Sequence, residues 1–265
     1  MKSMIGKNIL LTGATGGIGS ETAQILLENG CQLGLVGRSN AKLEELKERF
    51  SPFQHQLIAI QADINNVDDR RRLLAQMQQQ FGALDILINS AGTMDFTAFQ
   101  DQDDEILEKI FLTNTIAPMK LCKEVLPSML AAQKGHIVNI GSIFGSIAFA
   151  YFTTYSASKF ALRGFSEALR RELADTPVKV SYIAPRAVKT SLNSDDVYNM
   201  AKEVNMTMDP PQAVAKQIVK AIAKEQKDVF LGFPEALFVR LNALLPRLVD
   251  MGTRSQNRIA QKYLS

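Results

Sequence analysis

Short, nearly continuous apolar segments alternate along this chain with longer segments whose apolar residues recur every three or four positions. The short segments predict buried strands, because a strand covered on both faces needs no polar alternation. The amphipathic segments are long enough to return the chain for parallel pairing. We expect strands over residues 8–11, 32–36, 57–61, 84–88, 136–140, 178–183 and 229–231.

The segments between these strands carry helix signals. Ser39 can cap a helix whose Leu43, Leu46 and Phe50 fall on one face. Asp209-Pro210 is a second helix start, because proline is favoured in a first turn. We expect further helices over residues 67–81, 113–132 and 155–174.

The alternation predicts an α/β protein, namely one Rossmann-type doubly wound parallel sheet of about seven strands flanked by helices. We expect a single domain over residues 1–265. Within it, residues 1–190 would form the cofactor-binding and catalytic core and residues 191–232 a substrate-side segment. Residues 233–265 would form an amphipathic, helical C-terminal tail.

Composition and charge narrow the class of protein. The 30 basic and 27 acidic residues give a net charge of +3 and form no basic stripe, which argues against a nucleic-acid partner. Cys31 and Cys122 form no metal-binding motif, so we expect a reducing compartment and no metal. The chain also lacks a signal pattern and an apolar run of about 18 residues, which predicts a cytoplasmic location.

Glycines follow the first expected strand in the segment Thr12-Gly13-Ala14-Thr15-Gly16-Gly17-Ile18-Gly19. Bare backbone at such a turn can approach a pyrophosphate, and the N-terminus of the next helix favours its negative charge. The alternative is a tight turn with no ligand. The place of the segment in the first βα unit favours a dinucleotide, held by Gly13, Thr15, Gly17, Ile18 and Gly19.

Tyr155 and Lys159 lie four residues apart on an expected helix and therefore share one face. Alone, such a pair is typical of a solvated helix surface. Reduction of a carbonyl, however, needs a hydride on carbon and a proton on oxygen. A phenol titrates near about pH 10, and a neighbouring ammonium lowers that pKa. We therefore expect Tyr155 to be the acid and Lys159 the charge that adjusts it.

The order and spacing of these residues resemble the short-chain dehydrogenase/reductase family. The Thr-Gly-x-x-x-Gly-x-Gly loop of that family matches residues 12–19. Its Asn-Asn-Ala-Gly motif matches residues 89–92, with Ser90 as a departure. Its catalytic tetrad matches Asn114, Ser142, Tyr155 and Lys159, so the resemblance spans about residues 7–190.

The resemblance implies a role for each member of the tetrad. Tyr155 would exchange the proton, Ser142 would hydrogen-bond the substrate oxygen, and Lys159 would also hold the nicotinamide ribose. Asn114 would anchor a water that connects Lys159 to solvent. The structural alternatives are a strand-end cap for Ser142, a helix cap for Asn114 and a buried aromatic for Tyr155.

The resemblance also implies further cofactor contacts. Asp63 would contact the adenine, although it could simply cap the next helix. Arg186 stands where the family commonly has glycine, and we consider a contact with substrate or a cofactor phosphate. The remaining implied contacts are Asn89, Ala91, Gly92, Pro185 and Thr190.

The end of the second expected strand bears on the choice of nicotinamide cofactor. An acidic residue there would bind the ribose 2′-hydroxyl, whereas an arginine would pair with a 2′-phosphate. The chain reads Val36-Gly37-Arg38-Ser39, with no acid. Arg38 and Ser39 therefore favour NADP(H) over NAD(H). The alternative for Arg38 is a solvated loop cation.

We therefore expect an NADP(H)-dependent oxidoreductase that interconverts a carbonyl and an alcohol. Alternatives are a non-catalytic NADP(H)-binding regulatory or scaffold protein and, within the enzyme class, an NAD-dependent alcohol dehydrogenase. A serine hydrolase is poorly supported, because residues 141–145 lack the nucleophile-elbow pattern. His55 and His136 lie in no catalytic motif, and we expect both at the surface or a strand edge.

The segment over residues 233–251 is amphipathic, with apolar residues punctuated by Arg240 and Arg247. Its apolar face needs a partner, and we expect it to pack on the domain or a neighbouring subunit. The alternatives are peripheral membrane contact and a lid over a hydrophobic substrate. The family resemblance implies a homodimer or homotetramer.

Overall fold

The computed structural model of the protein describes residues 4–264, and seven parallel strands form one sheet in the order β3-β2-β1-β4-β5-β6-β7. The seven predicted strands and the doubly wound sheet are confirmed, with strand ends displaced by at most two residues. The strands are β1 (Asn8–Thr12), β2 (Gln32–Gly37), β3 (Leu57–Gln61), β4 (Ile86–Asn89), β5 (Gly135–Ile140), β6 (Val178–Ala184) and β7 (Asp228–Phe230).

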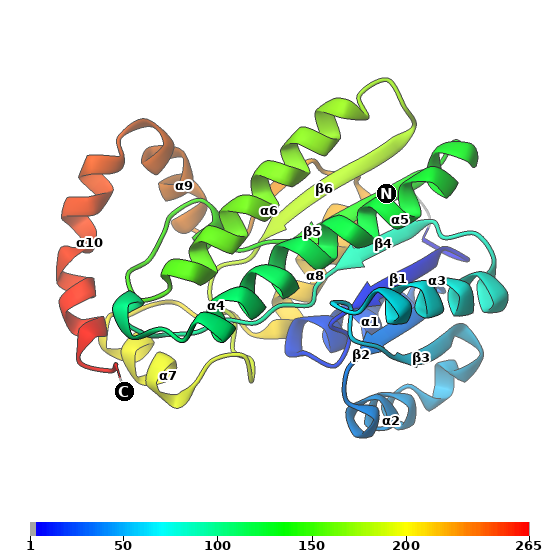
Figure 1. Cartoon of the computed structure of the whole chain (residues 1–265), viewed down its shortest axis with the longest axis horizontal. Coiled ribbons are helices and arrows are strands. Elements are labelled where there is room, and N and C mark those ends of the chain that lie inside the picture. Colours follow the sequence, from blue (N-terminus) through cyan, green and yellow to red (C-terminus); the bar gives the residue numbers. More distant parts are fainter. Residues whose placement is uncertain (1–3, 265) are drawn as a thin grey trace.

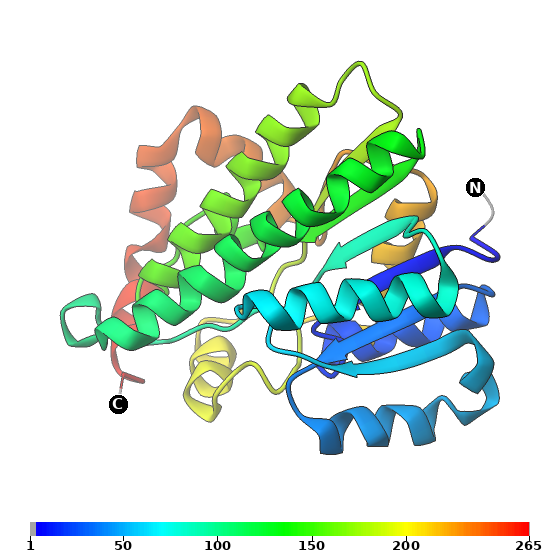
Figure 2. The same cartoon turned by 45° about the vertical axis from the view of Figure 1, so that its right-hand side comes forward.

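Helices cover both faces of the sheet (Figures 1 and 2). One face packs against α1 (Gly17–Glu28), α2 (Asn40–Arg49) and α8 (Pro211–Ala223). The other face packs against α3 (Val67–Phe81), α5 (Ala117–Ala131) and α6 (Thr153–Glu172). Because every central strand is covered on both faces, its apolar residues run continuously.

The helix starts follow from local capping. Ser39 accepts a hydrogen bond from the backbone of Lys42, so its predicted capping role is confirmed. Asn66, not Asp63, caps α3, and its side chain accepts bonds from two backbone N–H groups. Asp63 instead forms a turn, in which its Oδ1 accepts a bond of 2.9 Å from the backbone of Asn65.

The helix expected over residues 113–132 is interrupted. Helix α4 (Asp104–Phe111) begins earlier, capped by Asp103, and a π-helical turn (Leu112–Ile116) joins it to α5. Pro118 lacks a backbone N–H, so the carbonyl of Asn114 has no donor at the usual α-helical position four residues on. The irregular turn therefore falls at a predicted functional residue.

His136 is not at the surface or at a strand edge, as the sequence led us to expect. It lies at the start of β5, which is enclosed between β4 and β6, and only 6% of the residue is exposed. Its Nε2 lies 2.8 Å from the hydroxyl of Ser181. His55 is exposed, as expected.

The tail folds into two helices, α9 (Glu235–Leu244) and α10 (Pro246–Gln261), which stand at one end of the molecule (Figure 1). Val239 and Ala260 are buried, and α10 packs near α7 (Asp195–Glu203). The expected packing of the tail on the domain is thus present. Within the described part of the chain, no helix is both long and apolar enough to span a bilayer.

Arg186 ties this tail to the sheet. Its guanidinium binds both carboxylate oxygens of Asp209 at 2.8 and 2.9 Å and the carboxylate of Glu235, in α9, at 2.9 Å. It also donates to the backbone carbonyl of Phe233 at 3.1 Å. The two acids raise the pKa of Arg186 above its ordinary value. Arg186 is therefore occupied by protein carboxylates and not by an open phosphate site.

The exchange Arg186→Ala is expected to loosen the tail and lower the free energy of unfolding by about 3 kcal/mol, because two half-buried carboxylates lose their partner. Hydrogen exchange and limited proteolysis should show faster opening of α9 and α10. Arg240→Ala, which removes an exposed cation of α9, serves as the control. Unchanged exchange in both variants would contradict this role.

Candidate active site

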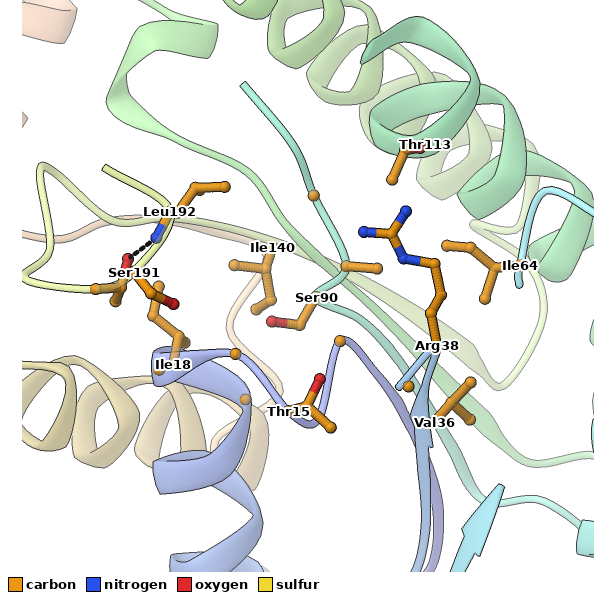
Figure 3. Close-up of a pocket in the computed structure, with 18 of the residues that line it drawn as sticks. Thr15, Ile18, Val36, Arg38, Ile64, Ser90, Thr113, Ile140, Ser191 and Leu192 are labelled. Atoms are coloured by element: carbon orange, nitrogen blue, oxygen red, sulfur yellow. Dashed lines mark hydrogen bonds between the residues drawn. The ribbon is translucent and has the colours of Figure 1, made fainter. Parts of the chain in front are cut away.

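A cleft of about 290 Å³ lies at the carboxyl ends of the strands, where β1 neighbours both β2 and β4. This switch point is where ligands bind in open α/β sheets. Figure 3 shows side chains from several loops converging on this cleft. It gathers most of the predicted cofactor residues: Gly13, Thr15, Gly17, Ile18, Gly19, Arg38, Asp63, Ala91, Gly92, Tyr155, Lys159 and Thr190.

The glycines allow chain segments to approach closely. Gly13 has a φ of +68°, and a Cβ atom there would lie 2.7 Å from the backbone of Ala91. A Cβ atom at Gly19 would lie 2.2 Å from the carbonyl oxygen of Gly13. No side chain caps the N-terminus of α1, so its first N–H groups are free of a side-chain partner. The residues present therefore fit a pyrophosphate.

Thr12 has a role that our sequence analysis did not assign. Its Oγ1 accepts bonds from the backbone N–H groups of Ser90 and Ala91, at 3.1 and 3.2 Å. These bonds hold the loop after β4 against the loop after β1. The sequence did single out Thr12, because it is the first residue of the glycine motif.

Arg38 stands at the end of β2, and its side chain extends across the cleft toward Thr113 and Ile64 (Figure 3). The sequence at the end of β2, residues 36–39, contains no acidic residue. Ser39 is exposed, and its hydroxyl caps α2 at 3.4 Å from the backbone nitrogen of Lys42. The Arg38 guanidinium thus suits a phosphate on the adenosine side of the cleft.

Tyr155 and Lys159 lie in the first turns of α6 and are 9% and 5% exposed. The Lys159 Nζ donates to the carbonyl of Ile140 at 3.1 Å and lies 5.7 Å from the centre of the Tyr155 ring. Tyr155 lines both the large cleft and a smaller one of about 90 Å³. It therefore stands where the two clefts meet.

The smaller cleft contains Ser142 and Pro185. Ser142 caps a short 3-10 turn, accepting from the Phe144 backbone at 3.1 Å, and its side chain lies close enough to the Tyr155 hydroxyl to lower the pKa of that group. The Tyr182 hydroxyl braces the backbone of Ser142 by donating to its carbonyl at 3.2 Å. Ser142 is therefore both a cap and a neighbour of the candidate acid, and Tyr182 is a supporting residue that sequence reasoning missed.

Asn114 is fully buried and does not line the large cleft. Its side chain accepts from the backbone N–H of Thr93 and donates to the carbonyl of Thr93, both at 2.8 Å. It also donates to the Ser158 hydroxyl at 3.0 Å. A Cβ atom at Gly92 would lie 3.4 Å from Asn114 Oδ1 and 3.7 Å from Lys159 Nζ, so both groups border Gly92.

Asn89, like Ser39, is a predicted cofactor contact that lines neither cleft. It is 2% exposed, donates to Asn139 Oδ1 at 2.9 Å and lies 3.5 Å from the Cys122 sulfur. Its position as the last residue of β4 turns the side chain toward β5 and α5. The side chain of Asn89 thus ties β4 to β5.

Burial sets the pKa values of the central pair. It raises the pKa of Tyr155 to about 12, against a smaller lowering by Ser142. It lowers the pKa of Lys159 to about 8. The expected lowering of the Tyr155 pKa is therefore not found in this structure, because desolvation raises this pKa and the opposing contribution comes from Ser142.

Cys31 and Cys122 are both buried and free, and burial raises the pKa of each thiol to about 12. Such thiols are unreactive. Among residues 4–264, no cluster of His, Cys, Asp or Glu is arranged to hold a metal ion.

We predict that Lys159→Met stabilises the cofactor-free protein at pH 7 by about 2 kcal/mol, since it removes a buried charge. The folded pKa of about 8 lies below the ordinary 10.5, so the unfolded chain binds more protons between these values. The native protein therefore gains stability as the pH rises through this window, and the advantage of the variant shrinks.

Urea unfolding at pH 7 to 10 measures this difference. Lys179→Met, at an exposed position of β6, is the control and should show a constant difference. If Lys159→Met is less stable than the native protein at pH 7, and the difference in unfolding free energy does not change with pH, then Lys159 is not a desolvated ammonium.

Comparison with known proteins identifies the family of this chain. The short chain dehydrogenase family model matches residues 7–201. Dehydrogenase/reductase SDR family member 7B of Bos taurus is 32% identical over 96% of this chain and 83% of its own length. Ketoacyl reductase HetN of a Nostoc species is 33% identical over 87% of this chain and 80% of its own.

Solved structures share the fold. A short-chain dehydrogenase/reductase from Burkholderia phymatum, in complex with NAD, covers 94% of this chain and 96% of its own with a TM-score of 0.85 and 21% identity. Serine dehydrogenase with NADP+ covers 84% of this chain and 93% of its own, with a TM-score of 0.75 and 28% identity. The chain therefore belongs to the short-chain dehydrogenase family of oxidoreductases.

Proposed function

We propose that this protein is an NADP(H)-dependent oxidoreductase that interconverts a carbonyl and an alcohol, with Tyr155 as the general acid and base. The observation that carries this proposal is the place of Tyr155 at the meeting point of the two clefts, beside Lys159 and Ser142. The large cleft suits a dinucleotide, and the small one suits the reacting end of a substrate. A bound nicotinamide cofactor would supply or accept the hydride.

The residues of the chain account for the proton. The raised pKa of Tyr155 keeps its hydroxyl protonated near neutral pH, which suits donation to a carbonyl oxygen. Ser142, which lines the same small cleft as that hydroxyl, can position the same oxygen. Lys159, with a pKa of about 8, can resupply the proton, and Asn114 borders it through Gly92.

Arg38 and the absence of an acid at the end of β2 support NADP(H) over NAD(H). The cofactors of the compared structures include both forms, so this preference depends on the residues of this chain. A 2′-phosphate would gain a charge-assisted bond from the guanidinium. An NAD-dependent enzyme and a non-catalytic NADP(H)-binding protein are the alternatives.

We also propose that the protein is an oligomer in the cytoplasm and that it contacts membranes peripherally. The tail supports membrane contact, because Phe233, Leu237, Leu244, Leu248 and Met251 are all more than half exposed. Exposed apolar residues close to basic ones suit the surface of a membrane.

Tyr155→Phe is expected to lower kcat for reduction of carbonyl compounds by about 10²- to 10⁴-fold, because the proton donor is lost. NADPH oxidation with a panel of ketones and aldehydes measures this effect. Tyr263→Phe, which removes an exposed hydroxyl bonded to Glu203, is the control. A Tyr155→Phe enzyme as fast as the native one would refute the assigned role. NADPH binding without turnover of any carbonyl would favour the non-catalytic alternative.

Arg38→Ala is expected to weaken NADPH binding by about tenfold or more and to leave NADH binding nearly unchanged, because only NADPH carries the 2′-phosphate. Calorimetric titration with both cofactors checks this. Arg71→Ala removes an exposed cation of α3 outside the cleft and should affect neither. Equal affinity of the native protein for both cofactors would rule out the NADP(H) preference.

A further inference from the structure

A third cavity, of about 480 Å³, lies beneath the two tail helices. It is lined by Pro234, which precedes α9, and by Glu235, Phe238 and Leu241 of α9, which recur every three residues and so share one face. The face that α10 turns toward it comprises residues 248, 249, 252, 253 and 256. We call this cavity the tail chamber.

The tail chamber adjoins the small cleft that contains Tyr155 and Ser142. Four residues line both spaces: Phe144, Arg186, Ala187 and Met206. The charge of Arg186 is balanced there by Asp209 and Glu235, so this junction presents no unpaired cation. The two spaces are therefore neighbours, and Phe144 and Met206 border both the cleft of the candidate acid and the chamber.

The dimensions and the lining indicate what the two spaces can take. The small cleft, at about 90 Å³, admits a carbonyl and a slim chain, whereas the tail chamber has the volume of a typical ligand site. The walls of the chamber are largely apolar, with Ile143, Ile147 and Phe149 opposite the two helices. Such walls favour a hydrocarbon chain, since burying each methylene group is favourable.

Gly252 borders the chamber and is itself exposed. It lies in the middle of the α10 face, and a Cβ atom built there would meet no atom within 4 Å. Its φ is not in the left-handed region, so other residues can occupy the position without backbone strain. Residue 252 can therefore carry a large side chain without disturbing the fold, and that side chain would stand at the wall of the chamber.

We propose that the substrate is a carbonyl compound, or the corresponding alcohol, with an extended unbranched hydrocarbon chain that occupies the tail chamber. This inference rests on the proposed function, which places the reacting oxygen at Tyr155. The tail helices then determine specificity by enclosing the part of the substrate that does not react. Arg186 is a positioning residue, because it holds α9 over the chamber.

A series of methyl ketones from butan-2-one to decan-2-one tests this inference with two readouts. The first is kcat/KM for NADPH oxidation. The second is the affinity of each ketone for the protein with NADP+, where no reduction can occur, measured by calorimetry and repeated without cofactor. Both are expected to rise by about threefold for each added methylene.

Gly252→Phe is expected to lower kcat/KM and affinity for decan-2-one by at least tenfold and to leave butan-2-one unchanged. Met251→Phe adds the same ring at the neighbouring exposed position outside the chamber, and should change neither. Circular dichroism and the melting temperature confirm that both variants fold.

The outcomes separate this inference from the function on which it rests. Reduction of butan-2-one with no dependence on chain length, or equal losses for short and long ketones in Gly252→Phe, would overturn the chamber and keep the oxidoreductase. Binding that rises with chain length and falls in Gly252→Phe, without any NADPH oxidation, would support the chamber and overturn the proposed reaction.

Discussion

The site depends on the close contact between the loop after β1 and the loop after β4. Thr12 binds the backbone of Ser90 and Ala91, and Gly13 permits an approach that a side chain would block at 2.7 Å. Because β1 pairs with both β2 and β4, this contact forms at the edge where the strand order reverses. Gly92, the next residue along the second loop, then borders both Asn114 and Lys159.

A second constraint is the burial of a cation beside a phenol. Lys159 has the Ile140 carbonyl as its hydrogen-bond acceptor, and its pKa falls to about 8. Tyr155 is held protonated by the same desolvation. The Tyr155 hydroxyl is therefore ready to protonate a substrate, and Lys159 holds a second proton beside it. Burying the Lys159 ammonium costs folding free energy, which the packing of the surrounding sheet must offset. Such a cost in stability is common where a residue is placed for chemistry.

Much of the fold could be predicted because doubly covered strands leave a strong signal. Apolar runs such as residues 8–12 and 32–37 have few polar interruptions, so their strands were placed within a residue or two. The glycine loop and the residues of α6 could be placed as well, since their spacing is fixed by local geometry. Tyr182, Ser158 and Asn139 could not, because their roles arise from contacts between segments far apart in the sequence.

Some departures from the sequence predictions have local causes and others have long-range ones. Asp103 caps helix α4 and Ser194 caps helix α7. Both residues are common N-caps, so the starts of these two helices could have been predicted from the sequence. The pKa of Tyr155 could not be predicted from its spacing to Lys159, because spacing gives proximity and not burial. The partners of Arg186 lie at residues 209 and 235, on other elements, and only the folded chain brings them together.

The central claim is that the loops at the carboxyl edge of the sheet bind a nicotinamide cofactor around the β1–β4 contact. Hydrogen exchange followed by mass spectrometry, with and without NADPH, tests it most directly. We predict slower exchange on NADPH binding in residues 13–19, 37–39, 90–93 and 190–192, with α9 and α10 little changed. Unchanged exchange in these loops, or protection confined to the tail helices, would contradict the account.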